Sequence, residues 1–285
     1  MTKVKVQSAE RLPWLLFLFV RLLHFFSSKL TLNFLTYIFT KPINYKTPER
    51  EAGFLKKAKK SMLKIPALNK TIACYQLKNK GPKIVLVHGW SARASIMFKI
   101  ALAFHECGYD VYSFDAPAHK NSSASNTALP EFIESLNHFN NTLGPFKYGI
   151  GHSIGAIAIL NQAKLNQPFD KIISIGANES IENIFKTFLG LFGLSEAYLE
   201  PLVERLSEKY HCVPYSMSPD IVYKELKSEA LFIHCKNDKE IHFSSSVNLN
   251  SLLLNSKLKL TEGLGHQRIL RDRSTINSML EFIKN

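Results

Sequence analysis

Apolar and polar residues alternate in blocks from about residue 71 to the C-terminus, and the blocks have the spacing of strands and of helices in turn. The run KIVLVHGW (83–90) is almost continuously apolar, as expected of a strand buried on both faces of a parallel sheet. This alternation predicts a doubly wound α/β sheet in which most strands are parallel. Strands are predicted at residues 71–77, 83–90, 109–116, 147–152, 171–177, 229–235 and 257–263, and the helices between them at 93–107, 129–142, 154–166, 180–192 and 195–210.

The alternation breaks between residues 178 and 228, where two helical stretches follow each other with no strand between them. Ligands of open α/β sheets bind beyond the carboxyl ends of the strands. An insertion at this point of the chain is expected over that edge, so we interpret it as a helical cap. The segment NSSASNTA (121–128) is rich in small polar residues and predicts a mobile loop.

Residues 1–64 have a different pattern and are interpreted as a helical N-terminal arm, with the α/β domain at residues 65–285. Thr47 and Pro48 are typical of a helix start, because a hydroxyl caps the first turn and proline fits its first position. We therefore predict a helix over residues 48–64.

The arm also contains a largely apolar run, residues 12–39, that looks like a membrane span. Arg21 and Lys29 interrupt this run, so its uncharged stretches are shorter than the ~20 residues that a spanning helix needs. A secretory signal peptide is not favoured either, because Arg21 cuts the apolar stretch short and no small-residue cleavage site follows.

The net charge of +13 is concentrated in this arm. Residues 1–64 hold thirteen Lys and Arg against three acids, whereas the other 221 residues are almost balanced. Composition does not separate a buried helix from an interfacial one. Two arrangements of the arm therefore stay open. Its apolar face packs on the α/β domain, or the arm lies on an anionic membrane. The five lysines between residues 56 and 64 favour the membrane arrangement. Nucleic acid is not expected as a partner, because no binding motif accompanies the charge.

The four cysteines are widely separated, which argues against a disulfide framework and against a zinc site. We therefore expect reduced thiols and a cytoplasmic protein. The basic arm indicates an alternative location, in which the protein is bound peripherally at the inner face of the membrane.

The stretch YGIGHSIGAIAIL (148–160) places Ser153 between Gly151 and Gly155, where a predicted strand meets a predicted helix. A serine on such a sharp turn is crowded by its neighbours, and glycine on both sides relieves the crowding. The N-terminus of the following helix directs unpaired N–H groups at the same place. A plain turn explains the glycines alone, but the strand–turn–helix setting favours a nucleophilic serine.

A nucleophilic serine needs a base and an orienting acid. Asp238 lies in HCKNDKE just past a predicted buried strand, and His266 lies in the glycine-bounded loop GLGHQRIL after the last strand. The order Ser, Asp, His is the one that this architecture uses in catalysis. Three acids compete with Asp238, and the last two of them look like solvated surface charges: Glu179, Glu240 and Asp272.

The segment HGW (88–90) predicts an oxyanion site, because its glycine lets the loop turn back under the nucleophile. The backbone N–H groups of Trp90 and Ile154 are the candidate donors. His88 is interpreted as a structural residue that satisfies loop backbone, not as the base. The residues expected beside the substrate are His88, Gly89, His152, Phe185 and Phe188.

Five motifs, LVHGW, FDAPAH, GHSIG, FIHCKND and GLGHQRIL, resemble in order and separation those of the α/β-hydrolase superfamily, in its esterase, lipase and thioesterase group. The resemblance covers about residues 71–285. It implies an α/β-hydrolase fold, with a mostly parallel eight-stranded sheet flanked by helices and a cap inserted after the sixth strand. It also implies Ser153 as nucleophile, Asp238 as acid and His266 as base, with no metal or organic cofactor.

One departure from the family pattern follows FDAPAH, where similar members usually continue with glycine but this chain has Lys120. We therefore expect the turn after Asp115 to be altered and the loop 118–128 to be displaced. This concerns the rim of the pocket, not the three catalytic residues.

The sequence thus predicts a serine hydrolase that cleaves carboxylic esters through an acyl-enzyme on Ser153, with thioesters and lipid-like acyl esters open as substrates. The apolar stripe that includes Phe185 and Phe188 either packs the cap on the body or lines an acyl pocket. Two alternatives stay open: a binding protein that kept the fold without catalysis, and a membrane-associated lipase or acyltransferase.

Overall fold

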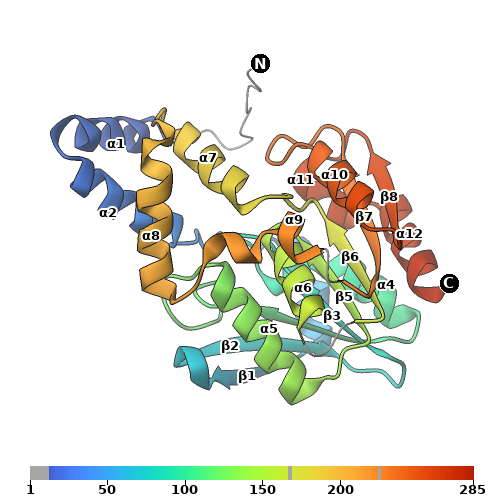
Figure 1. Ribbon diagram of the computed structural model, residues 1–285. Coiled ribbons are helices and arrows are strands. Elements are labelled where there is room, and N and C mark those ends of the chain that lie inside the picture. The colour runs from blue at the N-terminus through green and yellow to red at the C-terminus, as the bar shows by residue number, and fades with distance from the viewer. Residues whose placement is uncertain (1–12, 166–168, 224–225) are drawn as a thin grey trace.

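Eight strands form one sheet in the order β1-β2-β4-β3-β5-β6-β7-β8 in the computed structural model, which describes residues 13–165, 169–223 and 226–285 (Figure 1). Strand β2 runs antiparallel to β1 and β4, and the other neighbouring pairs are parallel. The mostly parallel eight-stranded sheet predicted from the sequence is therefore confirmed. The strands are β1 (Lys59–Ile65), β2 (Lys70–Leu77), β3 (Lys83–Val87), β4 (Asp110–Asp115), β5 (Tyr148–His152), β6 (Lys171–Ile175), β7 (Glu229–Cys235) and β8 (Ser256–Thr261).

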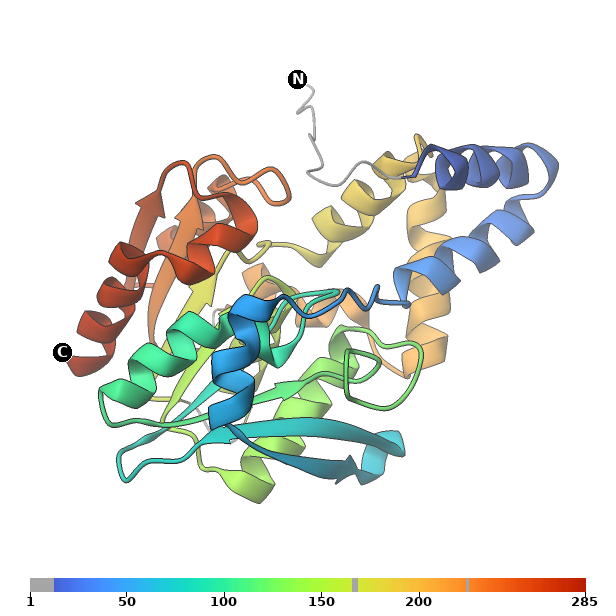
Figure 2. The ribbon, with the colours of Figure 1, turned by 180° about the vertical axis from the view of Figure 1, so that it is seen from behind.

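Helices cover both faces of the sheet, with α5 and α6 on one face (Figure 1) and α4 and α12 on the other (Figure 2). Side chains of β3 alternate between two hydrophobic cores, so Val85 belongs to one core and Leu86 to the other. Burial on both faces explains why this strand is a continuous apolar run. The helices are α1 (Trp14–Phe26), α2 (Ser28–Phe39), α3 (Ala52–Lys57), α4 (Phe98–Glu106), α5 (Leu129–Leu143), α6 (Ile154–Lys164), α7 (Ile181–Leu191), α8 (Leu199–Tyr210), α9 (Pro219–Val222), α10 (Ser244–Leu252), α11 (Gly265–Arg268) and α12 (Arg273–Lys284).

The segment between β6 and β7 holds α7, α8 and α9 and no strand among its described residues, so the helical insertion predicted after the sixth strand is present. Helices α7 and α8 are amphipathic. Their apolar faces are buried, whereas acidic and basic side chains lie on the outside. The insertion stands beside α1 and α2 in both views (Figures 1 and 2).

Helices α1 and α2 form a hairpin that packs against this cap. Arg21 Nη1 donates to the carbonyl oxygen of Gly193 at 2.9 Å, and His24 Nδ1 lies 2.8 Å from the hydroxyl of Tyr198. The opposite face of α1 is exposed and apolar. Both interpretations of the arm thus have a structural counterpart: one face packs on the protein and the other does not. No helix among the described residues is long and apolar enough to cross a bilayer, and residues 1–12 of the arm lie outside the described part of the chain.

The helix predicted over residues 48–64 is wrong beyond residue 57. Helix α3 ends there, and residues 59–65 form the edge strand β1, which pairs with β2 along its whole length. A tight turn with Asn69 in the left-handed region (φ 49°) joins the two strands. Pairing with β2 overrides the local helical pattern, and the lysines of β1 protect an exposed sheet edge against pairing with other chains.

Candidate active site

Ser153 lies at the sharp turn between β5 and α6. Its φ of 53° and ψ of −124° fall in a region that residues other than glycine rarely occupy. The turn is held because the N–H of Ser153 donates to the carbonyl oxygen of Ile175 on β6 at 2.9 Å. The serine therefore stands at the carboxyl end of β5, in the strand–turn–helix setting that its motif predicts.

Close backbone contacts explain both glycines of this motif. A Cβ on Gly151 would lie 2.3 Å from Cα of Ala156, and a Cβ on Gly155 would lie 2.3 Å from the carbonyl oxygen of Val87. Both distances are well below van der Waals contact. Helix α6 can therefore pack this closely on β5 and β3 only with glycine at the two positions.

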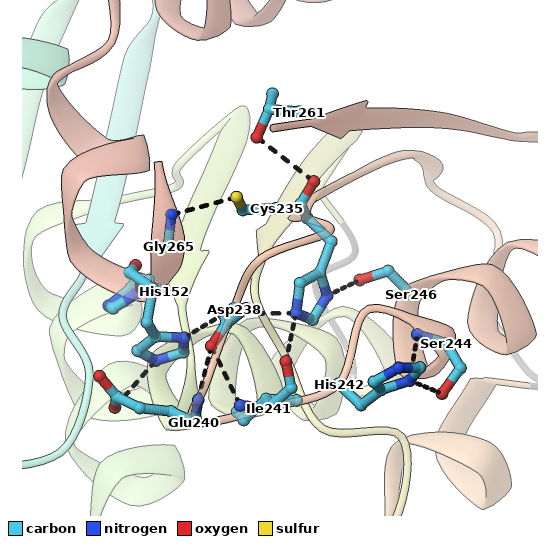
Figure 3. Close-up of polar contacts among 12 residues, drawn as sticks. His152, Cys235, Asp238, Glu240, Ile241, His242, Ser244, Ser246, Thr261 and Gly265 are labelled. Carbon is cyan, nitrogen blue, oxygen red and sulfur yellow. Dashed lines mark hydrogen bonds and ion pairs between the residues drawn. The ribbon is translucent and has the colours of Figure 1, made fainter. Parts of the chain in front are cut away.

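Asp238 lies in the loop that follows β7, and His266 lies on the short helix α11 that follows β8. The parallel pairing of the two strands brings these residues together. Nδ1 of His266 donates to Oδ2 of Asp238 at 2.7 Å. Oδ1 of Asp238 accepts the backbone N–H groups of Glu240 at 2.8 Å and Ile241 at 3.1 Å, as Figure 3 shows. The carboxylate is thus fixed by its own loop, and Nε2 is left as the imidazole nitrogen that can serve a nucleophile.

The surroundings move the pKa values of the two groups in opposite directions. Burial opposes ionisation of Asp238, but hydrogen bonds from His234 and His266 outweigh it and lower the pKa of the carboxyl. Burial also opposes the charged form of His266, but the carboxylates of Asp238 and Glu240 outweigh it and raise its pKa. Asp238 is therefore ionised at neutral pH and stabilises an imidazolium at His266.

His152 contacts the backbone of His266. Its Nε2–H donates to the carbonyl oxygen of His266 at 3.0 Å, and the centroids of the two rings are 4.5 Å apart. Burial holds the pKa of His152 well below its usual value, so this imidazole is neutral. Because His152 directly precedes Ser153, the contact links the turn of Ser153 to helix α11, which carries His266.

His234 belongs to the same cluster but was not predicted from the sequence. It is fully buried on β7, and its Nε2 lies 3.4 Å from Oδ2 of Asp238 and 3.0 Å from the carbonyl oxygen of Ile241. Its Nδ1 is 2.7 Å from the hydroxyl of Ser246. His234 therefore restrains both the acid and its loop. Its place four residues before Asp238, inside FIHCKND, was the available signal.

Of the three competing acids, Glu240 lies beside His266. Its Oε2 is 3.7 Å from Nε2 of His266, although its side chain is 39% exposed. Glu240 is therefore more than the solvated surface charge that was predicted. Glu179 instead accepts a hydrogen bond from α10, and Asp272 caps the first turn of α12.

The loop after β3 passes directly against Ser153. A Cβ on Gly89 would lie 3.1 Å from Cβ of Ser153. His88 is fully buried, and its Nε2 accepts the backbone N–H of Ala116 at 3.0 Å. Burial lowers the pKa of His88 to about 4, so the ring is a neutral acceptor that supports the loop. This contact agrees with the structural interpretation of His88.

A cavity of about 370 Å³ lies beside Ser153. Trp90 and Ile154 line it next to the serine, and Phe185 and Phe188 of α7 line it from the cap. Most of its other lining side chains are apolar as well. The predicted substrate neighbours that are not among its lining residues are His88, Gly89 and His152.

Lys120 forms the tight turn in which glycine was expected. Its φ of 41° is in the left-handed region, which glycine adopts more easily. The N–H of Lys120 donates to Oδ1 of Asn44 at 2.6 Å, and Ser123 N–H donates to the carbonyl oxygen of Thr71 at 2.8 Å. The turn is therefore present despite the lysine, and its loop is bonded to β2 and to the segment that follows α2.

The sequence model of the α/β hydrolase family matches residues 84–244. No curated protein is recognisably similar to the chain in sequence.

Among solved structures, an esterase from Pyrococcus furiosus has a TM-score of 0.63 at 16% identity, covering 86% of this chain and 98% of its own. A bacterial membrane phospholipase A has a TM-score of 0.62 at 16% identity, covering 82% and 88%. A bromoperoxidase from Bacillus anthracis has a TM-score of 0.61 at 18% identity, covering 80% and 100%. At these identities the likeness concerns the fold, and one fold carries several chemistries.

Proposed function

The chain belongs to the α/β hydrolase family, and we propose that it is a serine hydrolase that cleaves carboxylic esters through an acyl-enzyme on Ser153. One observation carries the proposal. Asp238 holds Nδ1 of His266 at 2.7 Å, and the carbonyl oxygen of His266 accepts a hydrogen bond from His152, the residue that precedes the strained serine. Family membership alone would not decide the reaction, because a bromoperoxidase has a similar fold.

In the first half of the reaction, Oγ of Ser153 attacks the ester carbonyl carbon while Nε2 of His266 takes the hydroxyl proton. The backbone N–H groups of Trp90 and Ile154 stabilise the oxyanion that forms. Asp238 stabilises the imidazolium. The carbon–oxygen bond to the alcohol then breaks, and His266 returns the proton to the departing alkoxide.

In the second half, His266 removes a proton from water, and the hydroxide formed attacks the acyl carbon on Ser153. Collapse of this intermediate breaks the bond to Oγ and releases the carboxylic acid, and His266 reprotonates the serine. An alcohol in place of water would make the same site an acyltransferase. The apolar cavity supports substrates with an apolar acyl group, among them thioesters and lipid-like esters.

The test is labelling by a fluorophosphonate together with hydrolysis of p-nitrophenyl esters and of matched thioesters. Wild type is expected to be labelled and active, and Ser153→Ala to be neither. Ser91→Ala is a matched control, because Ser91 also has positive φ (50°) on a loop close to the cavity-lining Trp90. Equal labelling of wild type and Ser153→Ala would refute Ser153 as the nucleophile. No turnover together with tight binding of an ester analogue would favour a non-catalytic binding protein.

We further propose that the arm holds the protein on anionic membranes, at the cytoplasmic face. Phe25 and Phe26 at the end of α1 are 81% and 71% exposed, and other apolar residues of α1 are exposed beside them. Residues 13–48 contain Lys and Arg but no acid. An apolar helix face with basic neighbours binds the headgroup region of anionic bilayers. Four free cysteines support a reducing compartment.

Cosedimentation with phosphatidylserine-containing vesicles tests this second proposal. The double substitution Phe25→Ser and Phe26→Ser is expected to abolish binding, and pure phosphatidylcholine vesicles are expected to bind wild type less. Leu254→Ser is the control, because Leu254 is also fully exposed but lies between α10 and β8. Undiminished binding by the double variant would refute the proposal.

A further inference from the structure

The arm supplies part of the wall of the cavity that contains Ser153. Ile38 and Phe39, at the end of α2, line the same cavity as the serine. The ring centroid of Phe39 is 5.1 Å from that of Phe185 and 4.9 Å from that of Phe188. The region matched by the family model begins only at residue 84. This wall therefore comes from a segment outside the matched family region.

The cavity extends away from the sheet toward the arm. Ser153 stands at the end of β5, whereas α2 packs against α8 and lies beyond the sheet in both views (Figures 1 and 2). Because the serine and Phe39 line one cavity, that cavity runs between these two places. An acyl group attached to Oγ would therefore extend along α7 toward the end of α2.

The end of α2 is held on two sides. Thr40, the residue after Phe39, is fully buried, and its carbonyl oxygen accepts the N–H of Thr127 at 2.8 Å. Its hydroxyl accepts from Nζ of Lys209 on α8 at 3.2 Å. The backbone that carries Phe39 is thus anchored to the segment before α5 and to the cap. A side chain on an anchored backbone forms a preorganised wall.

The lining chemistry selects an uncharged apolar group. The residues that line the cavity, all in the described part of the chain, include one acid, Glu240, and neither lysine nor arginine. Glu240 lies beside His266 at the catalytic end. The α2 end is formed by Ile38 and Phe39 together with the aromatic rings of α7. This arrangement suits an extended hydrocarbon chain whose ester group remains at Ser153.

We propose that Ile38 and Phe39 close the acyl end of the active-site cavity and set the length of the acyl chain that the enzyme accepts. The proposal rests on the proposed esterase function. The arm is then a specificity element of the catalytic site, and the substrates are esters of unbranched acyl groups. A chain that reaches Phe39 fills the cavity, and a longer chain meets the ring.

The experiment measures kcat/KM for p-nitrophenyl esters from acetate to palmitate. Phe39→Ala is expected to move the preferred acyl length upward, by about fourfold in kcat/KM for each newly accommodated methylene, and to leave the acetate almost unchanged. Phe39→Trp is expected to move the preference downward. Tyr37→Ala is the matched control, because Tyr37 lies on the same helix but is 51% exposed and does not line the cavity.

A second measurement separates this inference from the esterase proposal. Alkyl p-nitrophenyl ethers, which cannot be hydrolysed, bind without chemistry, so their dissociation constants report the cavity in every variant. If wild type hydrolyses esters through Ser153 but the length profile of Phe39→Ala equals that of Tyr37→Ala, the inference fails alone. If no ester is hydrolysed, the esterase proposal fails, and the dissociation constants of the ethers test the role of Phe39 by themselves. If Phe39→Ala and Phe39→Trp shift the preferred chain length in opposite directions, the inference that Phe39 limits this length is supported. If neither variant changes the preferred length, the inference is overturned.

Discussion

Oε2 of Glu240 lies 3.7 Å from Nε2 of His266, the imidazole nitrogen that accepts the serine proton in the proposed mechanism. The same imidazole donates from Nδ1 to Asp238 at 2.7 Å. The imidazole of His266 therefore stands between two carboxylates. One orients it, and the other raises the pKa of its imidazolium from the side of the cavity.

Replacement of Glu240 by glutamine is expected to extend activity to lower pH. A general base works when it is neutral, so kcat/KM rises as pH increases through the pKa of His266. Asp238 and Glu240 raise that pKa, and removal of the Glu240 charge lowers it again. The acidic limb of the pH–kcat/KM profile should therefore move to lower pH.

The control for this profile is Glu179→Gln. Glu179 is also an acid near the end of the sheet, but it is bonded to Asn248 and not to the base. Its profile should overlay that of wild type. An acidic limb that stays in place in Glu240→Gln would show that Glu240 does not act on His266.

Replacement of Asp238 by asparagine is expected to reduce kcat about 10³–10⁴-fold with the fold intact. The amide oxygen can still accept from the backbone of the loop, but the amide nitrogen would then face Nδ1 of His266. It would donate to Nδ1 and leave the proton on Nε2, which is the wrong tautomer for a base. Steady-state kinetics and thermal unfolding measure both effects. Asp272→Asn, which alters only a helix cap, should retain most activity; comparable losses in both variants would contradict the assignment.

Replacement of Gly155 by alanine is expected to destabilise the protein by about 3 kcal/mol or more, since overpacking against backbone has no flexible atom to move. The added Cβ would lie 2.3 Å from the carbonyl oxygen of Val87. Gly190→Ala is the contrasting variant, because Gly190 lies within α7 and an added Cβ would meet nothing within 4 Å beyond its own stretch of helix. It should gain about 0.5–1 kcal/mol from helix propensity. Urea unfolding measures both, and equal effects would argue against the close packing of α6.

Replacement of Glu51 by glutamine is expected to cost about 3–5 kcal/mol of unfolding free energy. Glu51 is fully buried, accepts from Nε of Arg93 at 2.7 Å and from the hydroxyl of Ser95 at 2.6 Å, and so ties the segment before α3 to the body. Its loss leaves a buried guanidinium without its counter-ion. The matched surface variant is Glu182→Gln, whose partner Lys186 is solvated. If the Glu51→Gln variant has the same urea midpoint of unfolding as wild type, the buried ion pair adds no stability.

Most of the sheet could be predicted from local pattern, because strands such as β3 and β7 are buried on both faces and read as continuous apolar runs. Strand β1 could not. Its lysines read like the basic end of a helix, and only pairing with β2 makes residues 59–65 a strand. The motif around Ser153 was readable for a related reason. The close packing of α6 on two strands requires glycine at fixed positions, so this tertiary contact can be recognised from the spacing of the two glycines in the sequence.

The sequence by itself determined the alternation of strands and helices, the turn that carries Ser153 and the order of the proposed catalytic residues, because each depends on neighbours along the chain. Only the tertiary structure decided that Glu240 lies beside His266, and that Phe39 of the arm reaches the cavity of Ser153. These contacts join segments whose separation and direction are set by sheet order and by helix packing. Neither residue type nor local spacing encodes which distant side chains will meet there.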